Sequence, residues 1–455
     1  MKKLMALLLA CIMVLSMLAG CGIGKSATAE NAEFQSDQVL KENKKQGKGS
    51  LVIWVEKSFS EEVDKLIDER IQAFGAEKGI EIKAEYISAI DYMTKLNAAV
   101  EAGNVPDVTL INPYKAVNYY PNLPFSDVTD LVEEIDAQRS MFSALKDGTK
   151  IEGVNYFVPF YAASSLLFLR KDLFDAKNIP LPTTWEELWE AAIKVSDPEN
   201  GIYGLGMGCG PTDEDCENSF RMMMWGLGGS IMSKDGQIVA DSDPGLSEMI
   251  DQYVKLYEAE AIPPAAITWD PGGNNKSYLM GESAMVINVP TLYNALKNDE
   301  QYAELFENTV VLNLPRGKAD NVVFGNPSGW AIMQDAKNKE NAREFIKYVS
   351  EKEWYDMYLD AIAPVFAPVF EDLVGSETWG DGVNKQAIEY VQNATGYYGY
   401  PCETLEGRAI ASKNYYSFPM ARLLNSILTG SATKEEAMAQ LAKEIQETAD
   451  LIKHK

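Results

Sequence analysis

The sequence predicts an α/β fold with two lobes. Two observations carry this prediction. First, more than 400 residues follow residue 50, which is longer than one ordinary hydrophobic core supports. Second, short β-branched or aromatic runs alternate with amphipathic stretches, first near the N-terminus and again later along the chain. Alternation of strand and helix is typical of a parallel sheet with crossover helices.

The first strand is expected at Leu51–Val55, a β-branched and aromatic run after a glycine-rich stretch. A helix is expected to begin at Ser60 and to end near Gly75 and Gly79. Its apolar residues recur at helical spacing: Val63, Leu66, Ile67, Ile71 and Phe74.

Residues 80–87 alternate as a second strand, residues 91–103 form a helix, and residues 105–113 form a third strand. Ligands of such sheets gather beyond the carboxyl ends of the strands. Those ends lie here at residues 55–58 and 111–114.

In the second set of elements, residues 155–174 hold two apolar runs, and residues 181–195 form a helix capped by Thr183 or Thr184. The glycine-rich segments 201–208 and 225–239 are expected to be strands and turns. The remaining expected elements are a helix at 247–260, a turn and strand within 277–290, a strand at 324–333, one long helix at 338–359, and a helix at 432–452.

The first 50 residues have a different character. Two lysines precede an apolar run, Leu4–Ala19, that is shorter than the roughly 20 residues of a membrane-spanning helix. This pattern favours a cleaved signal peptide at residues 1–20 over an ordinary membrane anchor. The sequence Leu-Ala-Gly-Cys that ends at Cys21 resembles the lipobox of bacterial lipoproteins, in which the cysteine carries lipid. Residues 21–50 are then a lipidated flexible tether with a reach of about 30 Å.

Composition excludes several classes of function. The formal net charge of −26 argues against nucleic acid as a partner. The single histidine, His454, lies next to the chain end, so a Ser-His or Cys-His catalytic pair is not expected. Neither a phosphate-binding Gly-x-x-x-x-Gly-Lys loop nor an EF-hand spacing is present, and we expect no cofactor and no metal. A carboxylate pair for glycoside hydrolysis stays open.

Five cysteines are present, of which Cys11 lies in the predicted signal and Cys21 in the lipobox. Cys209 and Cys216 flank a polar loop and would form a disulfide in an oxidising compartment. Two unpaired thiols are the alternative, because sequence alone does not decide the geometry. Cys402 is the odd one out.

Aromatic side chains cluster where strands end or turns begin. Sugar rings offer a C–H face that packs on an aromatic plane, and their hydroxyl groups need polar partners, so a cleft with both binds a neutral polyol. For any single aromatic residue, filling the core is the alternative. The residues concerned are Trp54, Tyr114, Tyr161, Trp225, Trp269, Trp330, Tyr397 and Tyr398, with Glu56, Asn112, Asn288 and Asn326 beside them.

Several segments in order resemble the extracellular solute-binding proteins of bacterial ABC importers, especially the sugar-binding group that includes maltose-binding protein. The segments that carry the resemblance are "VPDVTLINP", "LPTTWEEL", "GIYGLGM", "WGLGGSIMSKDG", "MGESAMVINVP", "AREFIKYVSEKE" and the closing Gly430-x-x-Thr433-x-Glu435-Glu436-Ala437. Where maltose-binding protein has a sugar-stacking aromatic, this chain has Val289-Pro290-Thr291 with Tyr293 two residues on, which argues against maltose itself.

The resemblance implies two α/β lobes that are joined by crossing strands and close on ligand as a hinge. It implies an N-terminal lobe of residues 51–160 and 325–362, and a C-terminal lobe of residues 161–324 and 363–455. The chain would cross between lobes near Val158–Tyr161, Val323–Asn326 and Ile362–Val365.

Motifs and resemblance together predict the ligand-binding residues: Trp54, Glu56, Asn112, Tyr114, Tyr161, Trp225, Trp269, Asn288, Tyr293, Trp330, Tyr398 and Tyr416. The expected function is capture of an extracellular sugar or oligosaccharide without catalysis, by a monomer held to the outer face of the cell membrane only through its lipid. Its partners would be the small-molecule solute and the subunits of an ABC permease. The alternatives are a glycan-acting enzyme and a binding protein for a polyamine or peptide, for which Glu56 and Asp91 would be the carboxylates to inspect.

Overall fold

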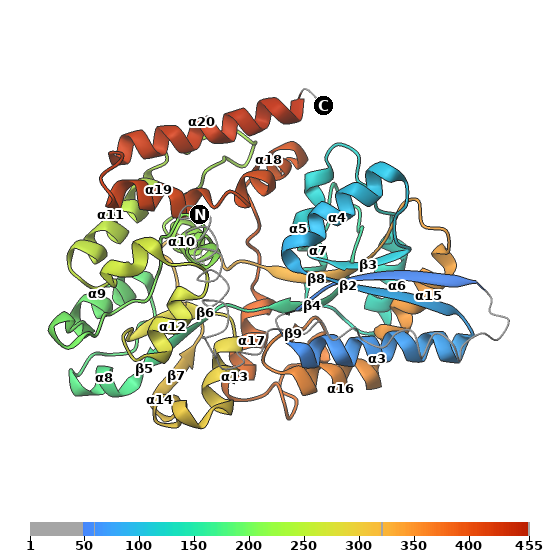
Figure 1. Cartoon of the computed structure of the whole chain (residues 1–455), viewed down its shortest axis with the longest axis horizontal. Helices are drawn as coiled ribbons and strands as arrows, with labels where there is room; N and C mark the ends of the chain where they lie inside the picture. The colour runs from blue at the N-terminus through green and yellow to red at the C-terminus, as the bar shows by residue number, and fades with distance from the viewer. Residues whose placement is uncertain (1–48, 59, 320–321, 454–455) are drawn as a thin grey trace, which may run out of the picture. The chain divides into compact units, whose positions relative to one another are not determined.

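Two β-sheets organise the chain (Figure 1). The computed structural model describes residues 49–58, 60–319 and 322–453. The predicted signal peptide, the lipobox cysteine Cys21 and nearly all of the predicted tether lie outside these ranges, as does His454.

The first sheet has six strands in the order β2-β1-β3-β8-β4-β9. Their bounds are β1 Ser50–Glu56, β2 Glu81–Ile87, β3 Val108–Ile111, β4 Val158–Ala163, β8 Asn326–Ile332 and β9 Ala367–Pro368. β1 pairs in parallel with β2 and β3, which confirms the predicted parallel arrangement of the first three strands. β8 then pairs antiparallel with β3 on one side and with β4 on the other.

The second sheet has three antiparallel strands in the order β6-β5-β7. They are β5 Leu166–Arg170, β6 Met285–Asn288 and β7 Thr309–Leu312. Only Ser164 and Ser165 separate β4 of the first sheet from β5 of the second. The chain returns to the first sheet between β7 and β8, and β9 still pairs with β4. The chain therefore changes sheet at 164–165 and at 313–325, and the predicted lobe boundaries remain a prediction.

The helix α3, Glu61–Lys78, forms as the periodicity predicts. Ser60 precedes it, three acidic residues lie in its first turn, and Gly79 ends it with φ 67°, a conformation that glycine adopts without strain. The buried side chains are Val63, Ile67, Ile71 and Phe74. This face packs on β2, and α15 (Lys339–Val349) and α16 (Lys352–Ile362) pack on α3 in turn.

Further helices cover both sheets. Beside the first sheet lie α4 Ala89–Ala102, α5 Pro113–Ala116, α6 Thr129–Gln138 and α7 Ser143–Gly148. Beside the second lie α8 Lys171–Ala176, α9 Trp185–Val195, α10 Glu214–Gly226, α11 Pro244–Glu258, α12 Gly273–Leu279, α13 Thr291–Asn298 and α14 Ala303–Glu307. The last four are α17 Gly382–Gln392, α18 Leu405–Tyr415, α19 Pro419–Leu428 and α20 Lys434–Lys453.

Three predicted elements are wrong or incomplete. Segment 201–208 is not a strand, because its backbone bonds go to several partners: Tyr203 N donates to Glu282 O, and Leu205 N donates to Ala261 O. Segment 225–239 begins as the end of α10 and continues as turns. The long helix expected at 338–359 is two helices, because Glu351 takes an extended ψ of 128° between α15 and α16.

The predicted cap of α9 is confirmed. Thr184 caps α9 and accepts a hydrogen bond from Glu187 N, while the Glu187 side chain bonds back to the cap in a capping box. Within the part of the chain that the structure describes, no helix combines the length and the apolar character needed to cross a bilayer.

Asp107 ties the first sheet to the start of α15. Its carboxylate accepts hydrogen bonds from Val52 N (3.0 Å), Lys337 N (2.8 Å) and Asn338 N (2.9 Å). The residue is 3% exposed. One carboxylate therefore satisfies backbone N–H groups from β1 and from the segment that follows β8, and these groups would otherwise be left without partners.

We expect Asp107→Ala to lower the free energy of unfolding by about 3 kcal/mol, because three partly buried backbone donors lose a charged acceptor. Urea denaturation of the mature protein measures this change. Asp235→Asn, on an exposed turn, serves as the control and should change stability by less than about 0.5 kcal/mol. An Asp107→Ala protein as stable as this control would contradict the assignment.

Candidate functional site

The carboxyl ends of β1 and β3 bring two opposite charges together. Glu56 ends β1, and Lys115 lies in α5, which follows β3 directly. Lys115 Nζ lies 2.6 Å from Glu56 Oε1, and the two side chains are 14% and 19% exposed. Because β1 and β3 are parallel neighbours, their ends meet at one edge of the sheet.

Asn112 positions α5 at this edge. The residue is buried, and its side-chain oxygen accepts a hydrogen bond from Tyr114 N at 2.8 Å, which caps the helix. Asn112 thus has a local structural role, because it caps the short helix that carries Tyr114 and Lys115 beyond the end of β3.

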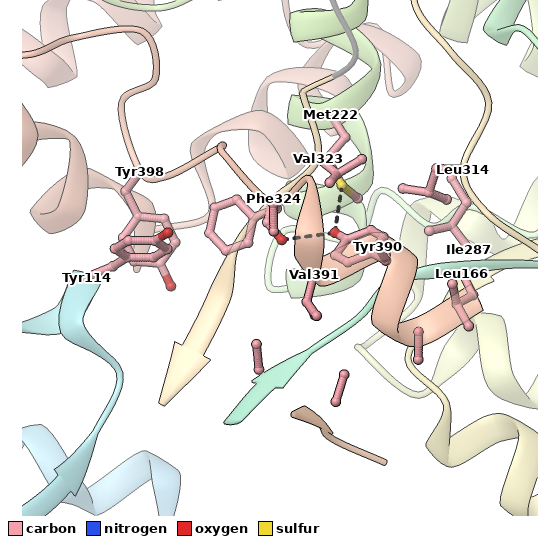
Figure 2. Packing of buried hydrophobic residues seen from close by; sticks show 14 of the residues in the cluster. Tyr114, Leu166, Met222, Ile287, Leu314, Val323, Phe324, Tyr390, Val391 and Tyr398 are labelled. Atoms are coloured by element: carbon pink, nitrogen blue, oxygen red, sulfur yellow. Dashed lines mark hydrogen bonds between the residues drawn. The ribbon is translucent and has the colours of Figure 1, made fainter. Parts of the chain in front are cut away.

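Tyr114 connects this edge to later parts of the chain. Its hydroxyl donates to Gly396 O at 3.3 Å, and its own carbonyl accepts from Ser412 Oγ of α18 at 2.9 Å. Its ring contacts Phe324, with centroids 5.9 Å apart, and Tyr398, with centroids 5.6 Å apart. Figure 2 shows Tyr114, Tyr398 and Phe324 lying together.

Phe324 lies at the centre of an aromatic stack. Its carbonyl accepts a hydrogen bond from Tyr390 of α17 at 2.9 Å, drawn in Figure 2. Its ring stacks on Trp225 with an interplanar angle of 9° and on Tyr398 with an angle of 29°. Two predicted residues, Trp225 and Tyr398, therefore meet through a residue that lies in the connection from β7 to β8.

The stack ends in two consecutive tyrosines with different exposure. The ring of Tyr415 stacks on Tyr398 at 3.9 Å and is 1% exposed. Tyr416 meets Tyr415 edge-on, with an interplanar angle of 87°, and is 38% exposed. Burial of the hydroxyl raises the pKa of Tyr416, and the carboxylates of Glu214 and Glu56 raise it further. Tyr416 is thus the exposed end of the stack.

Tyr161 lies on a separate aromatic pair. Its ring stacks on Phe366 with centroids 4.1 Å apart, and the residue is 4% exposed. Burial raises the pKa of Tyr161, and the charges of Asp64 and Glu56 add to this effect. The charge of Glu56 thus contributes to the raised pKa of both Tyr161 and Tyr416.

Three predicted residues of the second half lie beside α12 and α13. Asn288 ends β6, is 4% exposed and donates to Asn275 Oδ1. Trp269 packs against Gly273 so closely that a Cβ there would lie 2.4 Å from the indole ring. Tyr293 is half-buried against Phe306. None of these three has a described contact with the stack around Phe324.

Trp54 and Trp330 belong to the core. Trp330 is 0% exposed and packs edge-on against Phe160 and Phe345. Trp54 is 8% exposed, with Lys95 Nζ 5.0 Å from its ring. Both stand within strands rather than at their ends, so the sheet and its helices cover them. Whether either ring contacts a solute stays a prediction.

A family model described as bacterial extracellular solute-binding protein matches residues 69–395, well over half of the chain. The chain belongs to this family. Solved structures of similar proteins confirm the two-lobe α/β fold class that the sequence predicts for this solute-binding protein. One is an ABC transporter solute-binding protein from Thermotoga lettingae TMO bound with alpha-D-tagatose. It has a TM-score of 0.69 and 22% identity, and the match covers 88% of this chain and 100% of the neighbour.

Two curated relatives of the solute-binding protein match over most of their length. A maltooligosaccharide ABC transporter solute-binding lipoprotein of Streptococcus pneumoniae (strain ATCC BAA-255 / R6) is 23% identical, over 76% of this chain and 75% of the relative. A galactooligosaccharide-binding protein of Bacillus subtilis (strain 168) is 24% identical, over 77% of each.

The sequence did not single out several residues of the candidate site in this solute-binding protein. Lys115 directly follows the predicted residue Tyr114, so chain position was a usable signal for it. Phe324 falls within the predicted crossing Val323–Asn326, yet its stacking depends on α10 and on Tyr398, which are remote in sequence. For Phe366 no sequence signal exists.

A small cavity lies between the segment 205–208, Ile287 and the N-terminal end of α10. It has a volume of about 10 Å³, close to the space of one water molecule. Its polar lining includes Asp215, Ser219 and Asn274, and Asn274 Nδ2 donates to Asp215 Oδ2 at 2.9 Å. Burial raises the pKa of Asp215 to about 6, and it raises the pKa of the helix cap Asp213 to about 7.

The cysteines Cys209, Cys216 and Cys402 are free and buried. The structure thus holds the unpaired alternative for Cys209 and Cys216. Burial raises the pKa of Cys209 to about 11 and raises that of Cys216 as well, which keeps both thiols protonated and unreactive at neutral pH.

The raised pKa of Asp215 predicts a pH-dependent stability. An acid whose pKa is higher in the folded state stabilises the fold below its unfolded pKa, near 3.9, and this stabilisation is lost as pH rises through the folded value. We therefore expect the parent to lose stability between pH 4 and pH 7. Over the same range Asp215→Asn, which still accepts from Asn274, should lose about 1 to 2 kcal/mol less. Urea titrations at each pH measure the difference. Parallel profiles would show that Asp215 ionises normally.

Proposed function

We propose that this protein captures a neutral sugar or oligosaccharide outside the cell and delivers it to a membrane permease of the ABC type. Binding would take place between the lobes, with residues from both sheets closing on the solute and no bond being made or broken. The relatives named for maltooligosaccharides and galactooligosaccharides support this class of solute.

The observations that carry the proposal are the exposed ring of Tyr416 at the end of the aromatic stack and the Glu56–Lys115 pair at the edge of the first sheet. An exposed aromatic ring offers a face for the C–H groups of a sugar, while the carboxylate and Lys115 offer an acceptor and a donor for hydroxyl groups. Tyr416 stands at the end of the stack on the second half of the chain, and Glu56 stands at the edge of the first sheet.

The charges at this edge favour a neutral solute over a polyamine. Glu56 is already paired with Lys115. Asp91 accepts a hydrogen bond from Ser88 Oγ at 2.7 Å, at the N-terminus of α4, and so contributes to a helix cap. Glu56 therefore offers no uncompensated charge to a cationic solute, whereas a hydroxyl group can bond to the Glu56–Lys115 pair without separating it.

The connections between the sheets suit a hinge. The link at Ser164–Ser165 is two residues long, and the connection 313–325 carries Phe324 into the stack. We propose that the N-terminal lobe comprises residues 51–160 and 325–362 with the rest of the first sheet, and that the C-terminal lobe comprises residues 161–324 and 363–455. Closure is then favoured by the contacts that the solute makes with both lobes at once.

A thermal-shift screen tests the proposal. Neutral mono- and oligosaccharides, sugar alcohols, polyamines and short peptides are compared at saturating concentration, because binding stabilises the folded state by mass action. We expect a saccharide or sugar alcohol to raise Tm and the charged amines to leave it unchanged. Calorimetry with the best saccharide should show that Tyr416→Ala weakens binding about tenfold or more.

The control is Tyr302→Ala, a half-buried tyrosine on the short helix Glu300–Tyr302. It removes a ring of the same size away from the stack and should leave affinity unchanged. A Tm rise with amines alone would overturn the sugar assignment, and accumulation of cleaved saccharide beyond one equivalent per protein would overturn the assignment as a pure binder.

We further propose that a lipid on Cys21 holds the mature protein at the outer face of the membrane as a monomer. The name of the pneumococcal relative, a lipoprotein, supports this proposal. Cys21→Ser removes the thiol that would carry the lipid, so the protein should move from the membrane fraction to the soluble fraction in fractionation and immunoblotting. A serine variant that stays with the membrane would contradict the anchor.

A further inference from the structure

The turn that carries Tyr416 contains a strained residue. Phe418 has φ 50° and ψ 56°, the left-handed region that bulky side chains rarely adopt, and it directly precedes Pro419 at the start of α19. A flexible loop would relax out of this conformation. Other contacts must therefore hold the turn Tyr415–Pro419 in place.

The first such contact is a fully buried carboxylate. Glu217 of α10 is 0% exposed, and its Oε2 accepts hydrogen bonds from Met420 N at 2.7 Å and Ala421 N at 3.2 Å. These are N–H groups of the first turn of α19, which have no acceptor within the helix. The carboxylate thus replaces the side-chain cap that Phe418 does not supply.

Arg221 fixes the carboxylate from the other side. It is 1% exposed and lies one turn further along α10. Its Nε and Nη2 donate to Glu217 Oε1 at 2.9 and 2.6 Å. Both oxygens of Glu217 are then occupied, so the buried pair leaves no carboxylate oxygen without a partner and links α10 rigidly to α19.

The second contact comes from the surface side of the turn. Arg422 Nε donates to Ser417 O at 2.8 Å, and its Nη2 donates to Ser417 Oγ at 3.2 Å. The same guanidinium is paired with Glu444 of α20. Glu217 and Arg422 therefore hold the two halves of the turn, one from inside the protein and one from the surface.

The turn begins with two consecutive tyrosines that have different surroundings. The hydroxyl of Tyr415 lies 2.7 Å from Asn218 Oδ1 and 3.0 Å from Glu214 Oε1, both on α10, so this ring is anchored. Tyr416, the next residue, is left 38% exposed. Glu217, Arg422 and Tyr415 make the hydrogen bonds described above, and the ring of Tyr416 packs edge-on against Tyr415 and Tyr398.

We propose that Glu217 and Arg422 are positioning residues for solute binding, and that the strained turn they hold keeps Tyr416 ready to receive the solute. The expected effect on solute binding rests on the proposed function, whereas the geometry of the turn does not. A ring held in place before binding loses less conformational freedom when the solute arrives. Residues that hold the ring therefore raise the affinity without contacting the solute themselves.

The first experiment needs no solute. Hydrogen exchange of the mature protein is followed by mass spectrometry in the parent, in Glu217→Gln and in Arg422→Gln, together with nitration of Tyr416 relative to Tyr302 by tetranitromethane. We expect the amides of Ser417, Phe418, Met420 and Ala421 to exchange about tenfold faster or more in both variants, and the nitration ratio to change. Arg422 lies at the surface, so its variant remains informative if Glu217→Gln fails to fold.

The second experiment separates positioning from stability with the best saccharide of the thermal-shift screen. In a double-mutant cycle, Arg422→Gln should weaken binding severalfold in the parent and have no effect in the Tyr416→Ala background, because it acts through that ring. Asp356→Asn is the matched control. It breaks the Arg139–Asp356 ion pair of α16, which should lower stability while leaving affinity and the nitration ratio unchanged.

Unchanged exchange and unchanged nitration in both variants would overturn the proposal. Equal weakening of binding in both backgrounds would also overturn it, because the arginine would then act independently of Tyr416. If no saccharide binds, the proposed function fails, whereas the exchange and nitration results still decide whether Glu217 and Arg422 order the turn.

Discussion

The insertion of β8 between β3 and β4 is the constraint on which the rest of the fold depends. β8 lies more than 150 residues after β4 in the chain, yet it supplies the antiparallel partner for both strands. Without it the first sheet would consist of two unconnected parts. Because β8 begins at Asn326, its placement also fixes where Phe324 lies, and so fixes the centre of the aromatic stack.

The stack then connects elements that share no backbone hydrogen bonds within a sheet. Trp225 comes from α10, Phe324 from a connection between the sheets, Tyr398 from a loop, and Tyr415 from the end of α18. Because close-packed interiors deform little, rings that contact one another in this way fix the position of one element relative to the next. The polar groups at the edge of the first sheet and the exposed ring at the end of the stack therefore come from separate parts of the chain that are held in register.

Local features of the sequence predicted local structure well. The alternation from Leu51 to Ile111 correctly indicated three parallel strands with two helices between them, and Thr184 was a recognisable cap. Features that depend on distant partners were not accessible in this way. The periodicity of residues 338–359 does not reveal the break at Glu351, and the apolar character of Trp54 and Trp330 is the same whether a ring fills a core or lines a cleft. Whether the predicted ligand-binding set as a whole contacts solute remains a prediction, although the structure does bring Tyr114, Trp225, Tyr398 and Tyr416 together.

The burial of Cys209, Cys216 and Cys402 has a practical consequence. Within the described ranges no thiol is available at the surface, so a cysteine introduced at an exposed position would react selectively with a maleimide dye. One dye placed on each side of the Ser164–Ser165 link would report the separation of the two sheets by energy transfer. The native thiols could stay in place, which preserves the packing that their small apolar side chains provide.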